Sequence, residues 1–238
     1  YLIEVSAAVL QSIDEKSGQQ VIDQILDQAG QKGTGRWTVI EALKLGESAN
    51  TIEAAVGARG WSSEKNIRVM AEPLLAPGTE EAQLPKQEVL AKALLAGRIL
   101  AHAQGFRVLQ AASEEFEWSL DLAAISEIWR AGCIIRSTLL DEFASAFRSE
   151  LPGGHLILAP EMRRHLEGSI GGLRQVVAAG ATLGIAMPAL SASLAWYDTM
   201  RRARGTANMI QAQRDFFGAH GFERMDATGK HHGDWNPL

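Results

Sequence analysis

Residues 86–112, KQEVLAKALLAGRILAHAQGFRVLQAA, decide the fold of this chain. Apolar side chains recur in this stretch at the spacing of an α-helix and form one wide face: Val89, Leu90, Ala93, Leu94, Leu100, Ala101, Phe106 and Leu109. A face of this width is typical of a helix that lies inside a packed helical domain. We therefore predict a long helix from Lys86 to Ala112 as part of an all-α fold.

The composition supports this fold class and excludes several functions. Of the 238 residues, 46% are apolar and 6% aromatic, which favours close-packed helices over a β-sandwich. A net charge of −5 argues against a general nucleic-acid binder. The single cysteine, Cys133, excludes an intramolecular disulfide and fits a cytoplasmic protein. Because no activating partner is near it in the sequence, we interpret Cys133 as an inert core thiol.

The remaining helices are predicted from apolar spacing and from Gly, Pro and Ser signals at their ends. Val21 to Ala29 forms a short helix, and Ser48 caps the helix that ends near Gly60. The predicted helices cover 1–13, 21–29, 37–45, 48–60, 62–72, 86–112 and 120–147, and another begins at 160. The long central helices thus run from about 86 to 147. No stretch shows the alternation that demands a strand.

Three prolines in residues 73–85 mark the one plausible internal boundary. Residues 176–197 carry no charge, but their glycines and the central Pro188 argue against a membrane span and predict a break near Met187–Pro188. At the other end, the apolar pattern is already running at Tyr1. We expect from this that the chain begins inside a helix and that part of the protein is missing.

The first stretch with chemical potential is Gly30-Gln31-Lys32-Gly33-Thr34-Gly35-Arg36-Trp37. Glycines can turn backbone N–H groups toward one point, and Lys32 and Thr34 add a cation and a hydroxyl donor, so a phosphate or carboxylate is the natural ligand. Lys32 precedes Gly33, so this is not a Walker A loop. The alternative is a solvated loop with a C-cap glycine. Arg59 is either a second anion contact or a cation at a helix end.

The second stretch is residues 208–220, NMIQAQRDFFGAH. Gly218 can end the helix, so that His220 folds back toward Arg214 and both side chains bind an anionic ligand with hydroxyl groups. The alternative is a solvated arginine and a histidine at a helix end. His231 and His232 lack the spaced partners of a zinc site, and we predict no metal.

Four segments together resemble 6-phosphogluconate dehydrogenase, in the order of that family and along essentially the whole chain. They are Ala29–Thr38, Ala103–Phe106, Trp129–Ser137 and Asn208–His220. The family joins a dinucleotide-binding domain to a large all-helical domain, and this chain is similar to the second part alone. The resemblance implies that the family's catalytic Lys and Glu precede Tyr1. No catalytic residue is therefore assigned here.

The resemblance implies an NADP-linked oxidative decarboxylation of 6-phosphogluconate to ribulose 5-phosphate, a reaction of the pentose phosphate pathway. NAD is possible, and the coenzyme preference and cofactor-binding residues stay open. Lys32, Thr34 and Arg59 are implied as substrate contacts. Arg214 would bind the phosphate and His220 a hydroxyl group in the other subunit of a homodimer. Residues 1–205 would form the substrate-binding and dimerisation domain, and 206–238 a tail that reaches the partner. No metal, nucleic acid or membrane is implied.

Two other functions remain open at this stage. The chain could be a noncatalytic helical module that dimerises or binds anions, which would need no dinucleotide domain. It could also be a related β-hydroxyacid dehydrogenase. The substrates of those enzymes lack phosphate, and the combination of Lys32, Arg59 and Arg214 would then be hard to justify.

Overall fold

The structure, a computed structural model, describes residues 1–30, 32–75 and 83–235. This part of the chain contains eleven α-helices, two short 3₁₀ helices and one sheet of two strands. The prediction of an all-α fold is confirmed. The chain forms two compact units, Tyr1–Ala195 and Trp196–Leu238, which are described separately below. The sequence predicted a different boundary, at 205/206, between a substrate-binding and dimerisation domain and a tail that reaches the partner. That functional division remains a prediction.

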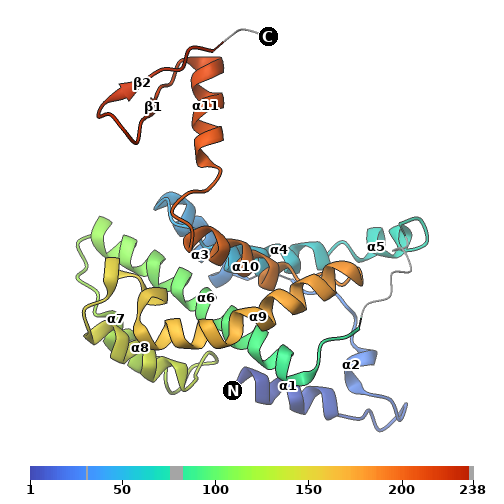
Figure 1. Cartoon of the computed structure of the whole chain (residues 1–238). Coiled ribbons are helices and arrows are strands. Elements are labelled where there is room, and N and C mark those ends of the chain that lie inside the picture. Colours follow the sequence, from blue (N-terminus) through green and yellow to red (C-terminus); the bar gives the residue numbers. More distant parts are fainter. Residues whose placement is uncertain (31, 76–82, 236–238) are drawn as a thin grey trace. The chain divides into compact units, whose positions relative to one another are not determined.

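The centre of unit 1 is the predicted long helix. It is α6, which runs from Gln87 to Glu115, and it packs along α9, Pro160–Thr182 (Figure 1). Their facing sides bury small and branched residues, among them Ala96, Ile99, Leu100 and Leu173. At Gly172 of α9 a Cβ atom would lie 2.6 Å from Lys92 Cβ and 3.0 Å from the Val89 carbonyl oxygen. A glycine there lets the two helices approach closely.

A helical hairpin covers one end of α6. It consists of α7, Leu122–Ile128, and α8, Leu139–Arg148. Phe106 of α6 holds it through ring contacts with Trp129, Phe143 and Phe147, at centroid distances of 5.5, 6.1 and 4.7 Å. Two 3₁₀ turns, Pro152–Gly154 and Leu156–Leu158, connect α8 to α9.

The prediction of one continuous helix from 120 to 147 is wrong. The chain leaves the helix at Trp129 and turns at Gly132, whose φ is +68°. Ile134, an apolar residue within the predicted helix over 120–147, is 66% exposed. Cys133 lies in the same turn and is partly exposed, so the prediction that it is a core residue is also wrong.

The N-terminal part of unit 1 contains five helices. They are α1, Leu2–Gln11; α2, Val21–Gln24; α3, Thr34–Lys44; α4, Asn50–Ser62; and α5, Lys65–Ala71. The predicted helix over 21–29 shrinks to α2, because the chain becomes extended at Ile25. Of the predicted linker, residues 76–82 lie outside the described residues. The elements on both sides of it belong to unit 1, so no boundary between units falls there.

The predicted break in the uncharged segment is confirmed. Helix α9 ends at Thr182, and α10 runs from Pro188 to Met200. In the described ranges we find no helix with the length and apolar character needed to cross a membrane.

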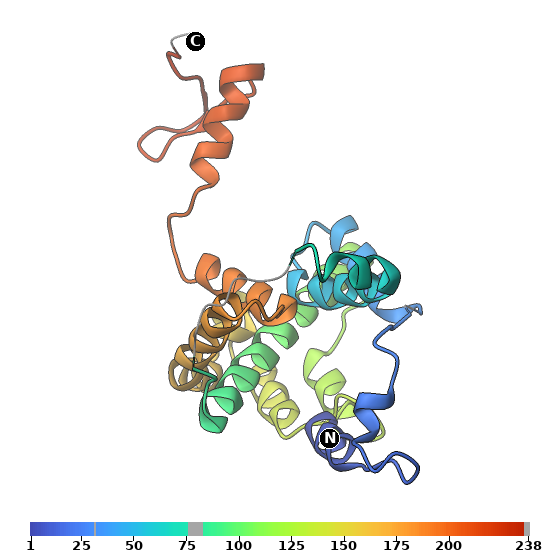
Figure 2. The same cartoon turned by 90° about the vertical axis from the view of Figure 1, so that its right-hand side faces the viewer.

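Unit 2 contains α11, Ala207–Gly218, and a small antiparallel hairpin beside it (Figure 2). The strands are β1, Phe222–Glu223, and β2, Lys230–His231, with Phe222 paired to His231. The sequence predicted the helix and its end at Gly218 but not these two-residue strands. They are too short to show an alternating pattern.

Candidate functional site

The glycine-rich loop leads directly into helix α3. Gly33 is its N-cap residue, with φ +58° and ψ −94°, and Thr34 is the first residue of the helix. Glycine suits position 33 because L-residues seldom adopt positive φ. Lys32 is exposed, and among the described residues its amine makes no ion pair or hydrogen bond. An exposed cation thus stands beside the free N–H groups of a helix N-terminus, the arrangement that favours anions. Gln31 lies outside the described residues.

Arg59 joins the end of α4 to this loop. Its guanidinium donates a hydrogen bond to the carbonyl oxygen of Gly30. This bond uses one of the five guanidinium N–H donors, and within 1–30, 32–75 and 83–235 we find no acceptor for the other four. The structure therefore brings Arg59 to the start of the loop that contains Lys32 and Thr34, as the anion-site interpretation expected.

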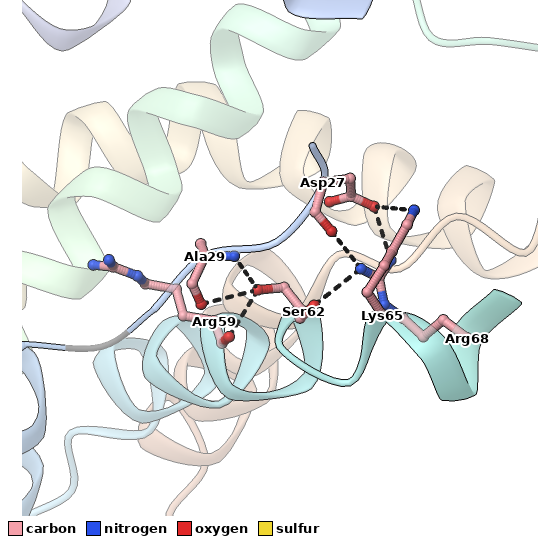
Figure 3. A network of polar contacts seen from close by, with 6 residues as sticks. All are labelled: Asp27, Ala29, Arg59, Ser62, Lys65 and Arg68. Carbon is pink, nitrogen blue, oxygen red and sulfur yellow. Dashed lines mark hydrogen bonds and ion pairs between the residues drawn. The ribbon is translucent and has the colours of Figure 1, made fainter. Parts of the chain in front are cut away.

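Ser62 connects the segment before the loop to the end of α4 (Figure 3). Its hydroxyl accepts the N–H of Ala29 at 2.9 Å and lies 3.2 Å from the Ala29 carbonyl and 2.8 Å from that of Arg59. Figure 3 shows the Arg59 guanidinium pointing away from the Asp27 cluster. The backbone before the loop is thus held against the end of α4, while the Arg59 guanidinium extends toward the loop.

Asp27 extends the network on the other side of Ser62. Its carboxylate accepts a bond from Arg68 Nη1 at 2.8 Å, and Lys65 Nζ is 3.8 Å away. Arg68 Nη2 also donates to the carbonyls of Asp27 and Ser62, at 2.6 and 3.0 Å. The bond from Arg68 lowers the pKa of Asp27 below its usual range. These contacts fix residues 27–29 against α4 and α5.

A buried glutamine of α6 fixes the opposite end of α4. Gln104 is fully buried, and its side-chain oxygen accepts the Thr51 N–H at 3.0 Å. Its amide nitrogen donates to Asn50 Oδ1 at 2.7 Å, and Asn50 donates to the Ala192 carbonyl at 3.1 Å. The prediction that Ser48 caps this helix is wrong, since the N-cap residue is Ala49 and the capping acceptor comes from α6.

Unit 2 forms a cavity of about 860 Å³ that contains the second predicted pair. Arg214 and His220 both line it, with other residues of α11 and the hairpin: Asn208, Gln211, Lys230, Glu223 and Trp235. The expectation that the chain folds back after Gly218 is confirmed. A Cβ atom at Gly218 would lie 2.8 Å from Cδ2 and Nε2 of His220, so the imidazole lies over the last turn of α11.

A buried carboxylate organises this unit, and the sequence analysis did not identify it. Asp215 is 3% exposed, and its oxygens accept four hydrogen bonds of 2.7–2.9 Å. The donors are the N–H groups of Gly221 and Gly233, the indole N–H of Trp235 and the ring nitrogen Nδ1 of His232. These four hydrogen bonds, of which the one from Gly233 has the largest effect, hold the pKa of Asp215 well below its usual range. Burial acts in the opposite direction but is outweighed. We call Asp215 and these four donors the Asp215 hub.

One of the two adjacent histidines near the end of the chain is a hydrogen-bond partner within the Asp215 hub. His232 contacts Asp215 Oδ1 at 2.7 Å, whereas His231 contacts the carbonyl oxygen of Thr228 at 3.1 Å. Only six residues separate Asp215 from Gly221, but Trp235 is 20 residues away. No local sequence pattern marks contacts of that range.

Residues 1–235 match the family described as 6-phosphogluconate dehydrogenase, C-terminal domain. The chain belongs to the 6-phosphogluconate dehydrogenase family. The resemblance seen in the sequence is therefore confirmed. The match covers both units, including every residue for which the sequence predicted a contact with substrate.

Curated 6-phosphogluconate dehydrogenases are similar to the chain at about two-fifths identity. The NAD(+)-dependent decarboxylating enzyme of Bacillus subtilis is 42% identical over 240 residues, and the NADP(+)-dependent enzyme of that organism 42% over 239. The decarboxylating enzyme of Escherichia coli is 42% identical over 238. Each alignment covers 99% of this chain and 51% of the relative. The chain thus spans about half the length of the curated relatives it matches.

A solved 6-phosphogluconate dehydrogenase from Plasmodium falciparum has the same fold. The two structures agree with a TM-score of 0.93 at 36% identity, over 99% of this chain and 51% of the other. The Plasmodium enzyme is described in its apo form, with its cofactor NADP+ and with its substrate 6-phosphogluconate.

Proposed function

We propose that this chain is the substrate-binding half of a decarboxylating 6-phosphogluconate dehydrogenase. In the complete enzyme it would act with a dinucleotide-binding domain to convert 6-phosphogluconate to ribulose 5-phosphate. The observation that carries the proposal is the match of residues 1–235 to the family. The noncatalytic module and the β-hydroxyacid dehydrogenase are less well supported, because the relatives above are named for the decarboxylating reaction.

The charges of both units suit a sugar acid phosphate. In unit 1, Lys32 and Arg59 neutralise negative charge at the loop, and the Thr34 hydroxyl lies at the start of α3 beside them. In unit 2, Arg214 binds a phosphate through parallel N–H donors. His220 exchanges a hydrogen bond with a substrate hydroxyl. Cations placed in advance offset the desolvation of the substrate and fix its orientation.

The described helices and strands do not form a classical dinucleotide-binding domain. A classical dinucleotide site needs a strand, a glycine-rich turn and a helix in succession. The described ranges contain only the two-residue strands β1 and β2, and these form a hairpin with each other. We therefore assign no coenzyme contact and no catalytic acid or base to this chain. The coenzyme is NADP or NAD, since relatives of both kinds are similar to it.

We further propose that the enzyme is a homodimer in which the tail completes the partner's site. Helix α11 exposes large apolar side chains, with Met209 61%, Phe216 45% and Phe217 72% exposed. Such a group of exposed side chains marks an interaction surface. Light scattering of the complete enzyme should give twice the monomer mass, and a concentration-independent monomer would contradict the dimer. We also propose that the enzyme is cytoplasmic and that its function involves no metal, nucleic acid or membrane.

The test is a chimera in which this chain replaces the matching half of the NAD(+)-dependent Bacillus subtilis relative. We expect reduction of NAD that depends on 6-phosphogluconate. Calorimetric binding of 6-phosphogluconate provides a second readout in case the joined halves turn over poorly. A chimera that neither binds nor oxidises this compound contradicts the proposal. Oxidation of unphosphorylated β-hydroxyacids alone would favour the related dehydrogenase.

Arg214→Ala in this chimera tests the assigned residues. Loss of a charge-assisted contact should raise KM for 6-phosphogluconate by about one to two orders of magnitude. Arg224→Ala is the matched control, because Arg224 lies in the same unit but pairs with Asp226 at 2.6 Å and does not line the cavity of Arg214. Equal KM values for both variants would refute the assignment of Arg214.

A further inference from the structure

We propose that Asp215 is a positioning residue that orients His220 toward the substrate. The inference rests on the proposed function, in which His220 contacts a substrate hydroxyl. It assigns to Asp215 a task in substrate recognition beyond holding the tail together.

Asp215 holds the backbone on both sides of His220. Its carbonyl oxygen accepts the N–H of Ala219 at 2.8 Å, and its carboxylate oxygen Oδ1 accepts the N–H of Gly221, also at 2.8 Å. The Gly221 N–H belongs to the peptide group that follows His220. This bond restrains the peptide plane that follows His220, and with it the path of the backbone at that residue.

The turn needs this support because its backbone is unusual. Ala219 and Gly221 have φ values of +48° and +73°, both in the left-handed region. For a non-glycine residue this conformation is unfavourable, so surrounding contacts must maintain it. Two left-handed residues around His220 reverse the chain and return the imidazole over Gly218.

The imidazole itself is left available for a ligand. Its ring contacts Phe217 edge-on, with centroids 6.1 Å apart. Across the described ranges, we find no hydrogen bond to either ring nitrogen of His220. The side chain lines the same cavity as Arg214. The restrained backbone and the ring contact with Phe217 therefore place an imidazole whose nitrogens bind no group in the described ranges.

A carboxylate suits this position better than its amide analogue. All four partners of the Asp215 side chain supply nitrogen, and three of them are N–H groups that can only donate. An ionised carboxylate offers acceptors alone, whereas an asparagine would direct its own NH₂ group at one pair of these partners. Asp215→Asn changes few atoms but should release either the Gly221 turn or the tail.

The test is a set of double-mutant cycles in the chimera described above, with kcat/KM for 6-phosphogluconate as the readout. His220→Ala and Asp215→Asn should each lower kcat/KM, the latter by about tenfold, mainly through KM. The double variant should be no worse than His220→Ala, because a residue that acts through His220 has nothing to orient once the ring is gone. Combined with Arg214→Ala, Asp215→Asn should be additive, since α11 itself holds the backbone of Arg214.

Trp235→Phe is the control for tail anchoring. It removes one hydrogen bond to Asp215 Oδ2 but leaves the Gly221 bond in place, so kcat/KM should change less than in Asp215→Asn.

Three results would overturn the inference. Additive effects of Asp215→Asn and His220→Ala would mean that the residues act independently. Non-additivity with both His220→Ala and Arg214→Ala would mean that Asp215→Asn simply unfolds unit 2. An unchanged kcat/KM in His220→Ala would remove the proposed role of His220 and that of Asp215 with it. Only the last result also counts against the proposed function.

Discussion

Unit 1 and the part of unit 2 that follows α10 are built around different kinds of buried side chain. The core of unit 1 is apolar, and Ile99, Leu100, Leu140 and Phe143 are fully buried in it. Between residues 201 and 235 of unit 2, the buried residues are Asp215 and Gly221. Unit 1 is thus assembled around apolar surface, whereas the described part of unit 2 after α10 is organised around a single carboxylate.

The difference matters because the two kinds of stabilisation fail differently. Apolar burial is non-directional, so the loss of one side chain is shared by many neighbours. A hydrogen-bonded centre is directional, and changing one acceptor leaves several donors without a partner. Substitutions in unit 1 should therefore lower global stability. Those at the Asp215 hub should disturb local geometry and ligand binding.

The largest effect is expected from Phe143→Ala in α8. Phe143 is fully buried and contacts the rings of Phe106 and His102, at 6.1 and 5.1 Å. Truncation leaves a cavity and should lower the free energy of unfolding by about 3–5 kcal/mol. Urea denaturation followed by circular dichroism measures the loss. A cost below about 1 kcal/mol would show that the core of unit 1 adapts more readily than its packing implies.

Gln104→Leu tests the one polar contact that unit 1 buries beside α4. The N–H of the buried Thr51 would lose its acceptor, and the half-buried Asn50 would lose one of its two side-chain hydrogen bonds. We expect a loss of about 1–3 kcal/mol, the cost of buried polar groups without partners. Because α4 carries Arg59, KM for 6-phosphogluconate should also rise in the chimera. Gln110→Leu, at a half-buried position of α6 where, among the described residues, the side chain bonds only to Glu114, is the control, and equal stabilities would contradict the prediction.

Acid should weaken the two units in different pH ranges. In unit 1, burial lowers the pKa of His102 in the folded protein below its ordinary value of about 6.5. As pH drops below that value, His102 is protonated in the unfolded chain before it is protonated in the folded protein, and the free energy of unfolding therefore falls. In unit 2, the folded pKa of Asp215 is lowered, so its contribution is complete above the ordinary pKa of about 3.9 and is lost only below it.

Residue-resolved amide hydrogen exchange can separate the two responses. Protection of the Gly221 and Gly233 amides should persist at pH 5, where protection in α6 has already declined. Simultaneous loss in both units, or earlier loss in unit 2, would contradict the assignment. Asp215→Asn should remove the pH dependence of the protection factors of the Gly221 and Gly233 amides.

The smallest effect on stability is expected from Gly218→Ala. Alanine favours the helix by up to about 1 kcal/mol, but its Cβ would lie 2.8 Å from the His220 ring and must displace it. KM for 6-phosphogluconate should rise a few-fold while the melting temperature stays equal or increases. Gly205→Ala is the matched control in the same unit, since a Cβ there meets no atom within 4 Å. An unchanged KM would mean that the ring position does not matter.

Elements with local signals could be predicted from the sequence. The apolar face of α6, the proline at the start of α9 and the glycine at the end of α11 each lie within the element that they define. The proximity of Arg59 to the loop and the return of His220 toward Arg214 were also anticipated. The roles of these residues in substrate binding remain predictions.

The errors occurred where distant contacts decide the structure. Apolar residues continue through 129–138, but Gly132 takes a left-handed conformation and Ile134 faces solvent. Helix α4 begins where Gln104, 53 residues from Thr51, supplies an acceptor. The donors of Asp215 are spread over residues 221–235. Spacing within one segment cannot show which distant side chain completes a cap or a turn.

The network around Asp27 in Figure 3 also determines which peptide bonds a protease can reach. Trypsin must take an arginine or lysine side chain into its own binding pocket, and the guanidinium of Arg68 is already bound to Asp27 and Ser62. Lys16, by contrast, is exposed in the turn between Asp14 and Gly18. Brief digestion should therefore cut after Lys16 well before it cuts after Arg68.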